Sequence, residues 1–411
     1  MNALLPLLTL LATVGPAAAV PELHLLTMGP GDELYTRGGH ASLLVVERRP
    51  DGSGSGTVYN YGDTDWQDPD LPWKFLKGEL TFFLAEPQSL EQTLETYGVQ
   101  QNRTIYRQRL NLTPEETRAV VARLEHDSQP DNRAYPYHHT NAICTTRIRS
   151  VLDDAVGGAI KTQLQPRLDE LTVRDYQRHA FESKMLPVLG ADLFLGPLHD
   201  RQPDLYDVLF QPRRMRDLLE KVELSPVDGA PRVLAGRPAQ LTRRAGGPAI
   251  RNSPKSSTLV PITLAWFLLG FLGLAVAKGL PRLSAAWVAG SFLPSGVVGS
   301  LIVAVVLVTG VPEMASNELL LSFPPTDLLV VPAAIGVLMG RRWPKAVRLY
   351  AVVRLAVMVG VLVGHTTGVL VQRPLMYVLL GFTCALGLWW FTRPSIAEPG
   401  APPLTPGAEP T

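Results

Sequence analysis

The chain has very little cysteine and no excess of charge of either sign. Its 411 residues contain two cysteines, Cys144 and Cys384, and the net charge is +1. Two isolated thiols exclude a disulfide framework and match no zinc-binding pattern. A balanced charge provides no global field that would attract nucleic acid or a strongly acidic partner. Because the sequence also contains no internal repeat, the uneven distribution of hydrophobic residues is the main guide to its organisation.

Hydrophobicity divides the chain into segments. Residues 21–257 have the mixed composition of a soluble protein, whereas residues 258–391 consist mostly of long apolar runs. Residues 392–411 are rich in proline and are expected to be disordered. Within the first segment, proline, glycine and arginine become frequent from about residue 225. We therefore expect a soluble domain over 21–224, a linker over 225–257 and a membrane domain over 258–391.

The first 20 residues, MNALLPLLTLLATVGPAAAV, are typical of a secretory signal peptide. An apolar core is followed by small residues where a peptidase can cut, near Ala19. The segment has no basic residue before its apolar core, so an uncleaved N-terminal anchor is the alternative. Both interpretations predict that the segment that follows is exported.

The membrane domain is predicted to contain about five helices, because crossing a bilayer takes about 20 apolar residues. The loops 278–284 and 341–348 are basic, whereas the loop 311–326 has no lysine or arginine. The positive-inside rule places the basic loops in the cytoplasm, and so places the soluble domain outside. This agrees with the signal peptide. The five predicted spans lie near 258–277, 285–309, 327–340 (extended toward 321), 349–371 and 374–391.

The soluble domain is predicted to be of the α+β class. Apolar runs at 23–31 and 40–49 predict strands, and residues 57–63 predict the returning strand of a hairpin. Thr113 and Pro114 begin a pattern typical of a helix that extends to 129. Further patterns predict a helix at 89–100, a strand at 104–112, a strand or a helix within 72–86, and a loop at 51–56.

Cys144 lies at the predicted start of another helix, for which Thr140 and Asn141 are the N-cap candidates by residue type. Free N–H groups and the helix dipole at such a position favour a thiolate and so lower the thiol pKa. The same N–H groups can bind an oxyanion. The helix itself is predicted from an apolar face and a double-glycine stop, formed by Ile148, Val151, Leu152, Ala155, Gly157 and Gly158.

A free cysteine is most often a small buried hydrophobic residue, and this is the alternative interpretation of Cys144. Export into an oxidising compartment without a second cysteine in the domain favours a catalytic thiol instead. Such a nucleophile needs a base. His40 is the best candidate because it follows two glycines at the start of a predicted strand. His138 and His139 lie close to Cys144 in the sequence, but no metal site is expected.

The order of these residues resembles that of circularly permuted papain-like, NlpC-type thiol enzymes, in which the histidine precedes the cysteine. More closely, the chain resembles the bacterial lipoprotein N-acyltransferases of the Lnb type, which join a periplasmic thiol domain to membrane helices. The resemblance extends over nearly the whole chain. It is carried by LLTMGPGDELYTRGGHASLLV (25–45), YNYGDTD (59–65), FLKGELTFFL (75–84), DNRAYPYHHTNAICTTRIRSVLDDAVGG (131–158), LPVLGADLFLGPLHDRQPDLYDVLFQP (186–212) and NELLLSFPPTDLL (317–329).

The resemblance implies that Cys144 is the nucleophile and His40 the general base. It implies a third, orienting residue on the returning strand, for which we select Asn60, with Asp63 as the second choice. Turn residues at the end of a hairpin are the alternative for both. Tyr35 is a candidate donor to an oxyanion, with a packed tyrosine as its alternative. In the family pattern an asparagine directly precedes the nucleophile, whereas NAIC places Asn141 three positions before Cys144.

The implied activity moves a fatty-acyl chain from a phospholipid, through a cysteine thioester, to the N-terminal amine of a diacylglyceryl-cysteine lipoprotein. No cofactor is expected, and the location implied is the bacterial inner membrane. The rival enzyme is a periplasmic peptidase or amidase acting on cell-wall peptides. The non-enzymatic rival is an assembly or binding protein that retains an inactive thiol fold.

Polar residues in the membrane half are further candidates for substrate binding, because ionisable groups there are costly. His365 lies near the outer end of a predicted span, and Glu313 and Asn317 lie in the outer loop. Arg354 lies about one turn from the cytoplasmic edge, where we expect its side chain to extend into the headgroup region.

Overall fold

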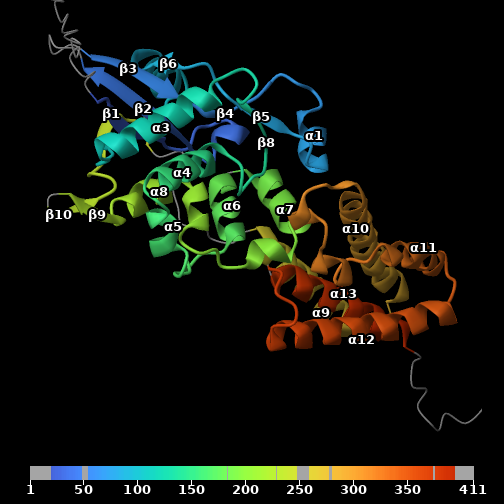
Figure 1. Cartoon of the computed structure of the whole chain (residues 1–411). Coiled ribbons are helices and arrows are strands. Elements are labelled where there is room, and N and C mark those ends of the chain that lie inside the picture. The colour runs from blue at the N-terminus through green and yellow to red at the C-terminus, as the bar shows by residue number, and fades with distance from the viewer. Residues whose placement is uncertain are drawn as a thin grey trace, which may run out of the picture. The chain divides into compact units, whose positions relative to one another are not determined.

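The computed structural model describes residues 20–48, 54–182, 184–227, 229–247, 259–276, 280–373 and 375–393. The chain forms two compact units (Figure 1). Unit 1 contains Met1–Lys184 and Gln202–Pro254, and unit 2 contains Met185–Arg201 and Lys255–Thr411. The expected signal peptide and all but the first two residues of the expected tail lie outside the described residues.

Unit 1 is built on a six-stranded sheet with the order β11-β7-β1-β2-β3-β6, in which every neighbouring pair is antiparallel. The strands predicted near 23–31, 40–49 and 104–112 are present as β1, β2 and β7. The bounds are β1 Glu22–Met28, β2 His40–Arg48, β3 Gly54–Tyr59, β6 Gln88–Ser89, β7 Ile105–Arg109 and β11 Ala239–Thr242.

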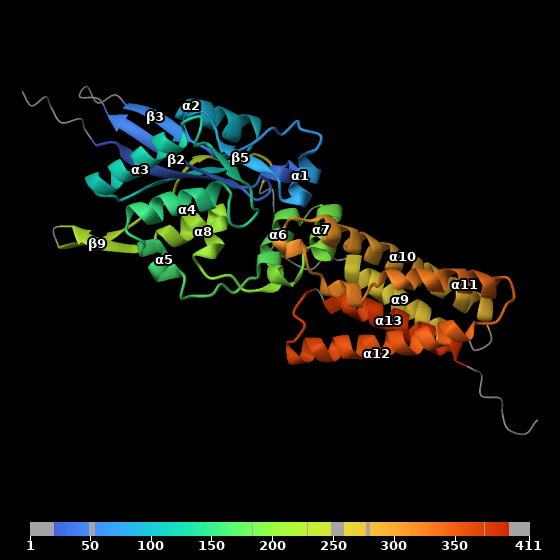
Figure 2. The same cartoon turned by 45° about the vertical axis from the view of Figure 1, so that its right-hand side comes forward.

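Alternating side chains bury both faces of this sheet. Leu25 and Leu43 face one core, which also contains Ile148 of α4. Leu26 and Leu44 face a second core, closed by the segment 90–97. Helix α4 packs on β2, with α3 and α8 beside it (Figures 1 and 2). The helices of unit 1 are α1 Leu71–Lys77, α2 Leu90–Thr93, α3 Pro114–Asp127, α4 Cys144–Ala155, α5 Ala159–Leu164, α6 Val173–Phe181 and α8 Pro212–Leu219, with 3-10 turns at Leu34–Thr36 and Asp207–Phe210.

A smaller sheet of three antiparallel strands, in the order β4-β5-β8, carries the return of the hairpin. β4 (Tyr61–Asp63) pairs with β5 (Thr81–Leu84), which pairs with β8 (Ala134–Pro136). The predicted strand 57–63 is therefore split at Asn60 between two sheets. The ambiguous stretch 72–86 contains both a helix, α1, and a strand, β5. The α+β class is confirmed.

The expected linker over 225–257 is partly wrong, since three strands extend into or lie within it. β9 (Glu223–Val227) pairs with β10 (Ala230–Val233), and β11 extends the large sheet beside β7. Thr242 fixes this edge, because its hydroxyl accepts a bond from the Ile105 N–H at 3.1 Å and donates to the Arg103 carbonyl at 2.9 Å. The strand is held by pairing with a distant segment, which composition does not reveal.

Unit 2 is helical, as predicted, and its long helices run alongside one another (Figure 2). Among the described residues, four helical segments are long and apolar enough to cross a membrane: Pro281–Val308, Pro312–Leu338, Lys345–Thr367 and Leu375–Thr392. A shorter apolar helix covers Thr263–Val276. The elements are α7 Met185–Phe194, α9 Leu259–Val276, α10 Pro281–Val308, α11 Val331–Leu338, α12 Lys345–Thr367 and α13 Leu375–Thr392, with 3-10 turns at Pro197–Asp200, Pro312–Met314, Glu318–Leu321 and Pro325–Val330.

Helix α7 belongs to unit 2, although its sequence lies within the stretch expected to form the soluble domain. Leu189, Leu193 and Phe194 pack against a cluster that contains Ile302 and Tyr377. The mean hydropathy of this helix resembles that of the spans, but its 10 residues are too few to cross a bilayer.

The expectation that the Arg354 side chain extends into the headgroup region is wrong. Its side chain is 3% exposed and its Nε lies 3.2 Å from Oδ1 of Asp327, which is fully buried. Its guanidinium also donates to the carbonyls of Leu321 and Ser322. Backbone that is not α-helical at membrane depth needs such donors, because no water is there to replace them. The pair therefore stabilises the irregular segment before α11.

Candidate active site

His40 is fixed at the end of the large sheet. It is the first residue of β2 and is paired with Met28, the last residue of β1. The preceding Gly39 has φ +83°, and a Cβ there would lie 3.0 Å from the Met28 carbonyl oxygen and 3.1 Å from Cγ of Pro212. Only glycine fits this conformation and this space without strain. The glycine before the histidine thus lets the backbone pass close to the end of β1 and to Pro212.

Asn60 contacts the imidazole of His40. Nε2 of His40 lies 3.2 Å from Oδ1 of Asn60, and the hydroxyl of Ser42 donates to the same oxygen. Asn60 is 3% exposed and is positioned by the break between β3 and β4. With the amide oxygen facing both groups, Nε2 carries the proton, and Nδ1 is the basic nitrogen of the neutral ring. The residue selected from sequence as the third member therefore contacts the histidine.

Cys144 is the first residue of α4, at the position the sequence predicted. The predicted caps are wrong: Ile143 directly precedes the helix, and its N–H donates to the hydroxyl of Thr146 at 2.9 Å. Thr145 anchors the turn by donating from its hydroxyl to the Phe210 carbonyl at 2.8 Å. As a whole residue, Cys144 is half-buried.

The thiol and the imidazole are both shifted toward their neutral forms. Burial raises the pKa of the Cys144 thiol, although the N–H groups of Ala41 and Thr145 hydrogen-bond the sulfur and Arg103 acts in the same lowering direction. Burial and then the charge of Arg103 lower the pKa of His40 to about 3, against the effect of its bond to Asn60. The expectation of a lowered thiol pKa is therefore wrong, because burial outweighs the helix terminus.

Arg103 and Tyr97 are the polar residues of this region that sequence reasoning missed. The Tyr97 ring stacks on His40 with centroids 5.2 Å apart, and the Arg103 guanidinium lies 5.4 Å from the centre of that ring. Arg103 is 2% exposed and donates to the carbonyl of Gly29 at 2.7 Å and to Oε1 of Gln101 at 3.0 Å. The positive charge of Arg103 is therefore held in place on the Tyr97 ring, which stacks on His40.

The backbone that presents these two residues is irregular. Residues Leu94–Gln100 form a π-helix rather than the predicted α-helix, and Asn102 has φ +48°. Such departures are costly and are found at functional sites. The sequence signal was a glycine, Gly98, inside an otherwise helical pattern; a Cβ there would lie 2.8 Å from Cγ2 of Thr242.

Three other sequence candidates lie apart from this arrangement. Asp63 is exposed and its carboxylate accepts from the N–H of Thr64 at 3.0 Å. Tyr35 is 56% exposed and stacks on Trp66. Asn141 is exposed in the turn before α4, where its N–H lies 3.2 Å from Nδ1 of His138. The hydrogen bonds and ring contacts described for these three side chains do not involve His40 or Cys144.

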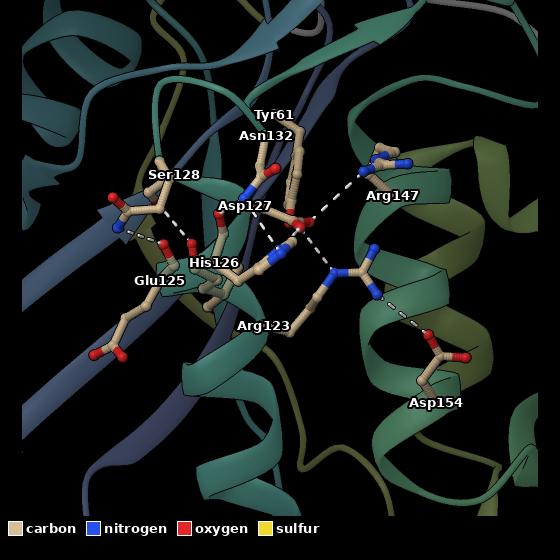
Figure 3. Close-up of polar contacts among 11 residues, drawn as sticks. Tyr61, Arg123, Glu125, His126, Asp127, Ser128, Asn132, Arg147 and Asp154 are labelled. Carbon is tan, nitrogen blue, oxygen red and sulfur yellow. Dashed lines mark hydrogen bonds and ion pairs between the residues drawn. The ribbon is translucent and has the colours of Figure 1, made fainter.

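A buried carboxylate joins the strand and the helices that carry the site (Figure 3). Asp127, at the end of α3, accepts hydrogen bonds from the Tyr61 hydroxyl and from Nε of Arg123, both at 2.8 Å. Arg147 of α4 lies 3.6 Å from the same carboxylate. Tyr61 is the first residue of β4 and lies between Asn60 and Gly62 in the sequence. Asp127 therefore links this strand to α4, the helix that begins at Cys144.

In unit 2 the sequence candidates have structural partners. Asn317 is 9% exposed; its amide donates to the Leu193 carbonyl at 2.6 Å and accepts from Nε2 of Gln372 at 3.0 Å. The Glu313 carbonyl accepts from the N–H of Gly196 at 2.7 Å. His365 is partly buried in the last turn of α12. The contacts of Asn317 fit a structural role.

Comparison with known families finds two family models that match the chain. The family model of the Lnb N-terminal periplasmic domain matches residues 17–179, which include His40, Asn60 and Cys144. The model of the Lnb transmembrane domain matches residues 253–391. No curated protein and no solved structure matches the chain. The two models together cover most of the chain, which therefore belongs to the Lnb family of lipoprotein-modifying membrane proteins, with a periplasmic N-terminal domain and a transmembrane domain.

Proposed function

We propose that this chain is a thiol-dependent lipoprotein N-acyltransferase of the inner membrane. The donor is a phospholipid and the acceptor is the N-terminal amine of a diacylglyceryl-cysteine lipoprotein. The observation that carries the proposal is the placement of Cys144, at a helix start, beside the strand that presents the hydrogen-bonded pair His40 and Asn60. Membership of a lipoprotein-modifying family supplies the substrate class.

In the first half-reaction the Cys144 sulfur attacks the ester carbonyl of the phospholipid. Nδ1 of His40 accepts the thiol proton as the S–C bond forms, since both groups start neutral. The C–O bond to glycerol then breaks, and the imidazolium returns the proton to the leaving oxygen. The products are a thioester on Cys144 and a lysophospholipid.

In the second half-reaction the lipoprotein amine attacks the thioester carbonyl. His40 accepts a proton from the amine as the C–N bond forms, and returns it to sulfur as the C–S bond breaks. The amide product leaves the thiol and imidazole in their starting forms. Asn60 holds the ring throughout, because its Oδ1 accepts a hydrogen bond from the Nε2–H of His40; this is a positioning role.

Two backbone N–H groups, one in the first turn of α4 and one in β2, are the proposed oxyanion donors. The N–H groups of Ala41 and Thr145 hydrogen-bond the resting sulfur. An attacked carbonyl carbon lies next to sulfur, so its oxygen comes within reach of the same donors. Preorganised N–H groups of this kind contribute about 10²–10³ in kcat.

Trapping the thioester tests the proposal. Purified full-length protein is incubated with phospholipid without acceptor, and Cys144 is examined by peptide mass spectrometry. We expect a fatty-acyl adduct that neutral hydroxylamine removes, and no adduct on the corresponding peptide of the Cys144→Ala variant. Addition of a diacylated lipopeptide should discharge the adduct to an N-acyl product. An unmodified Cys144 combined with cleavage of cell-wall peptides would instead support the peptidase alternative.

A further inference from the structure

A series of aromatic side chains extends from the surface of unit 1 toward Cys144. It starts at two exposed rings from separate loops, Tyr35 at 56% exposure and Trp66 at 40%, which stack with centroids 4.4 Å apart. Leu34 beside them is 54% exposed. Large apolar side chains gathered on a surface are a mark of a binding site.

The loop that carries Trp66 is held in place. Asp65 accepts a hydrogen bond from the N–H of Gln67 at 3.0 Å, and Asp68 accepts one from the N–H of Asp70 at 2.9 Å. The hydroxyl of Thr64 donates to the Thr81 carbonyl of β5 at 3.1 Å. These bonds fix the loop to the small sheet. The loop therefore holds the Trp66 indole in its exposed position.

The rings continue inward from Trp66. Its ring meets Phe82 edge to face at 5.7 Å, and Phe82 meets Tyr137 at 4.4 Å. Phe82 is 8% exposed, so the series passes from solvent into the core within two ring contacts. We refer to Tyr35, Trp66, Phe82 and Tyr137 as the aromatic series.

Gly62 brings the aromatic series to the thiol. This residue forms an irregularity between β4 and β5 and has φ +98°. A Cβ at this position would lie 3.4 Å from Cβ of Cys144 and 3.9 Å from Cδ2 of Phe82. The absence of a side chain therefore leaves a methyl-sized space between Cys144 and the Phe82 ring.

We propose that the aromatic series binds the hydrocarbon part of the acyl group that Cys144 accepts. This inference rests on the proposed function, because it takes the thioester as the reacting species. An acyl chain on sulfur starts at Gly62 and must be accommodated beyond it. Phe82 of the aromatic series lies there, and from it the series leads outward to the exposed rings of Trp66 and Tyr35.

Alkylation of Cys144 by N-alkylmaleimides of increasing chain length tests the proposal without acyl transfer. Rates are measured on full-length protein in one detergent, with the label at Cys144 quantified by peptide mass. In wild-type protein we expect the rate to increase at least tenfold from N-ethyl- to N-octylmaleimide, since each buried methylene contributes up to about fourfold. Trp66→Ala and Phe82→Leu should reduce this gain, taken as the ratio of each variant's own N-octyl- and N-ethylmaleimide rates, to less than threefold.

Trp73→Ala is the matched control. This indole is 48% exposed on α1 and contacts Lys77, outside the aromatic series. The Trp73→Ala variant should keep the full increase in alkylation rate from N-ethyl- to N-octylmaleimide. An equal gain in Trp66→Ala, Phe82→Leu and wild type would mean that micelles alone cause it, and would overturn the proposal. An alkyl-dependent gain without any phospholipid-derived thioester would instead reject the acyltransferase and retain the hydrocarbon site.

Discussion

His40 is half-buried and Arg103 is buried, yet only the arginine is charged near neutral pH. The pKa of His40 is lowered to about 3 by burial and by Arg103, whereas burial lowers that of Arg103 only to about 10. The imidazole is therefore a neutral base over the whole physiological range. Its protonation should not cause a loss of activity between pH 8 and pH 6, where an exposed histidine would titrate.

Comparison of substitutions at Asn60 and Asp63 tests the proposed roles of the two residues. Asn60 is proposed to orient His40, whereas Asp63 stabilises a turn. We expect Asn60→Ala to lower kcat by about 10²-fold, because the imidazole loses the acceptor that fixes its tautomer. Asp63→Ala should stay within about twofold, since its carboxylate bonds only its own turn. Acyl transfer to a diacylated lipopeptide measures both. Equal losses in the two variants would contradict the assignment.

Arg103 provides a pH-dependent test. Its positive charge favours the Cys144 thiolate and disfavours the imidazolium of His40. Arg103→Met should therefore raise the thiol pKa and slow iodoacetamide alkylation at pH 8 by about fivefold, while the plateau rate at high pH is kept. Arg103→Lys should restore most of the rate. A profile in Arg103→Met that matches wild type would show that the arginine acts through structure alone.

The sequence was informative for residues whose role follows from local position and less so for buried polar partners. Cys144 and His40 were identifiable because a helix start and a glycine pair are local signals. Arg103 resembles any surface arginine until the fold buries it against Tyr97. The direction in which the pKa of the Cys144 thiol shifts also depends on burial, which no local sequence pattern reports.

At the scale of elements, the site lies where several segments depart from regular geometry. The π-helix Leu94–Gln100 and the left-handed Asn102 present Tyr97 and Arg103, and the irregularity at Gly62 opens space beside Cys144. The regular strands β1 and β2 were predictable from their apolar runs. The irregular elements, and β11, were not, because they depend on partners far away in the sequence.

Asp127 should stabilise unit 1 in a pH-dependent way. Burial raises its pKa, but hydrogen bonds from Tyr61, Arg123 and His126 outweigh this, and the pKa lies below 3.8. A carboxylate with a lowered pKa stabilises the fold above its unfolded pKa and ceases to do so as pH falls through the folded value. Asp127→Asn should cost about 1.5–3 kcal/mol at pH 7.

The difference between wild type and Asp127→Asn should shrink as the pH falls below about 4. Tryptophan fluorescence during denaturant unfolding at pH 7, 5, 4 and 3 measures it. Asp154→Asn is the control, since Asp154 pairs with the same Arg123 at 3.6 Å but its side chain is 72% exposed. Asp154→Asn should lower the free energy of unfolding by less than about 0.5 kcal/mol. A constant difference across pH would contradict the assignment.

At the scale of the whole molecule, the ion pair between Arg354 and Asp327 supports the membrane unit. Arg354→Gln leaves the Asp327 carboxylate buried without its cation, and should cost about 3–5 kcal/mol. Adding Asp327→Asn to this variant should recover part of the loss. Thermal unfolding in detergent is the measurement. Lys345→Gln, at the exposed start of α12, should melt like wild type, and Arg354→Gln should not.

The assignment of α7 to unit 2 determines how the protein can be produced in pieces. The chain passes from unit 1 to unit 2 after Lys184, returns after Arg201 and leaves again after Pro254. A gene fragment that encodes residues 20–254 would therefore express unit 1 together with an orphaned apolar helix, whose Leu189, Leu193 and Phe194 lose their partners. Such a fragment should aggregate or require detergent. A fragment in which a short polar loop replaces residues 185–201 should be the one that stays in solution.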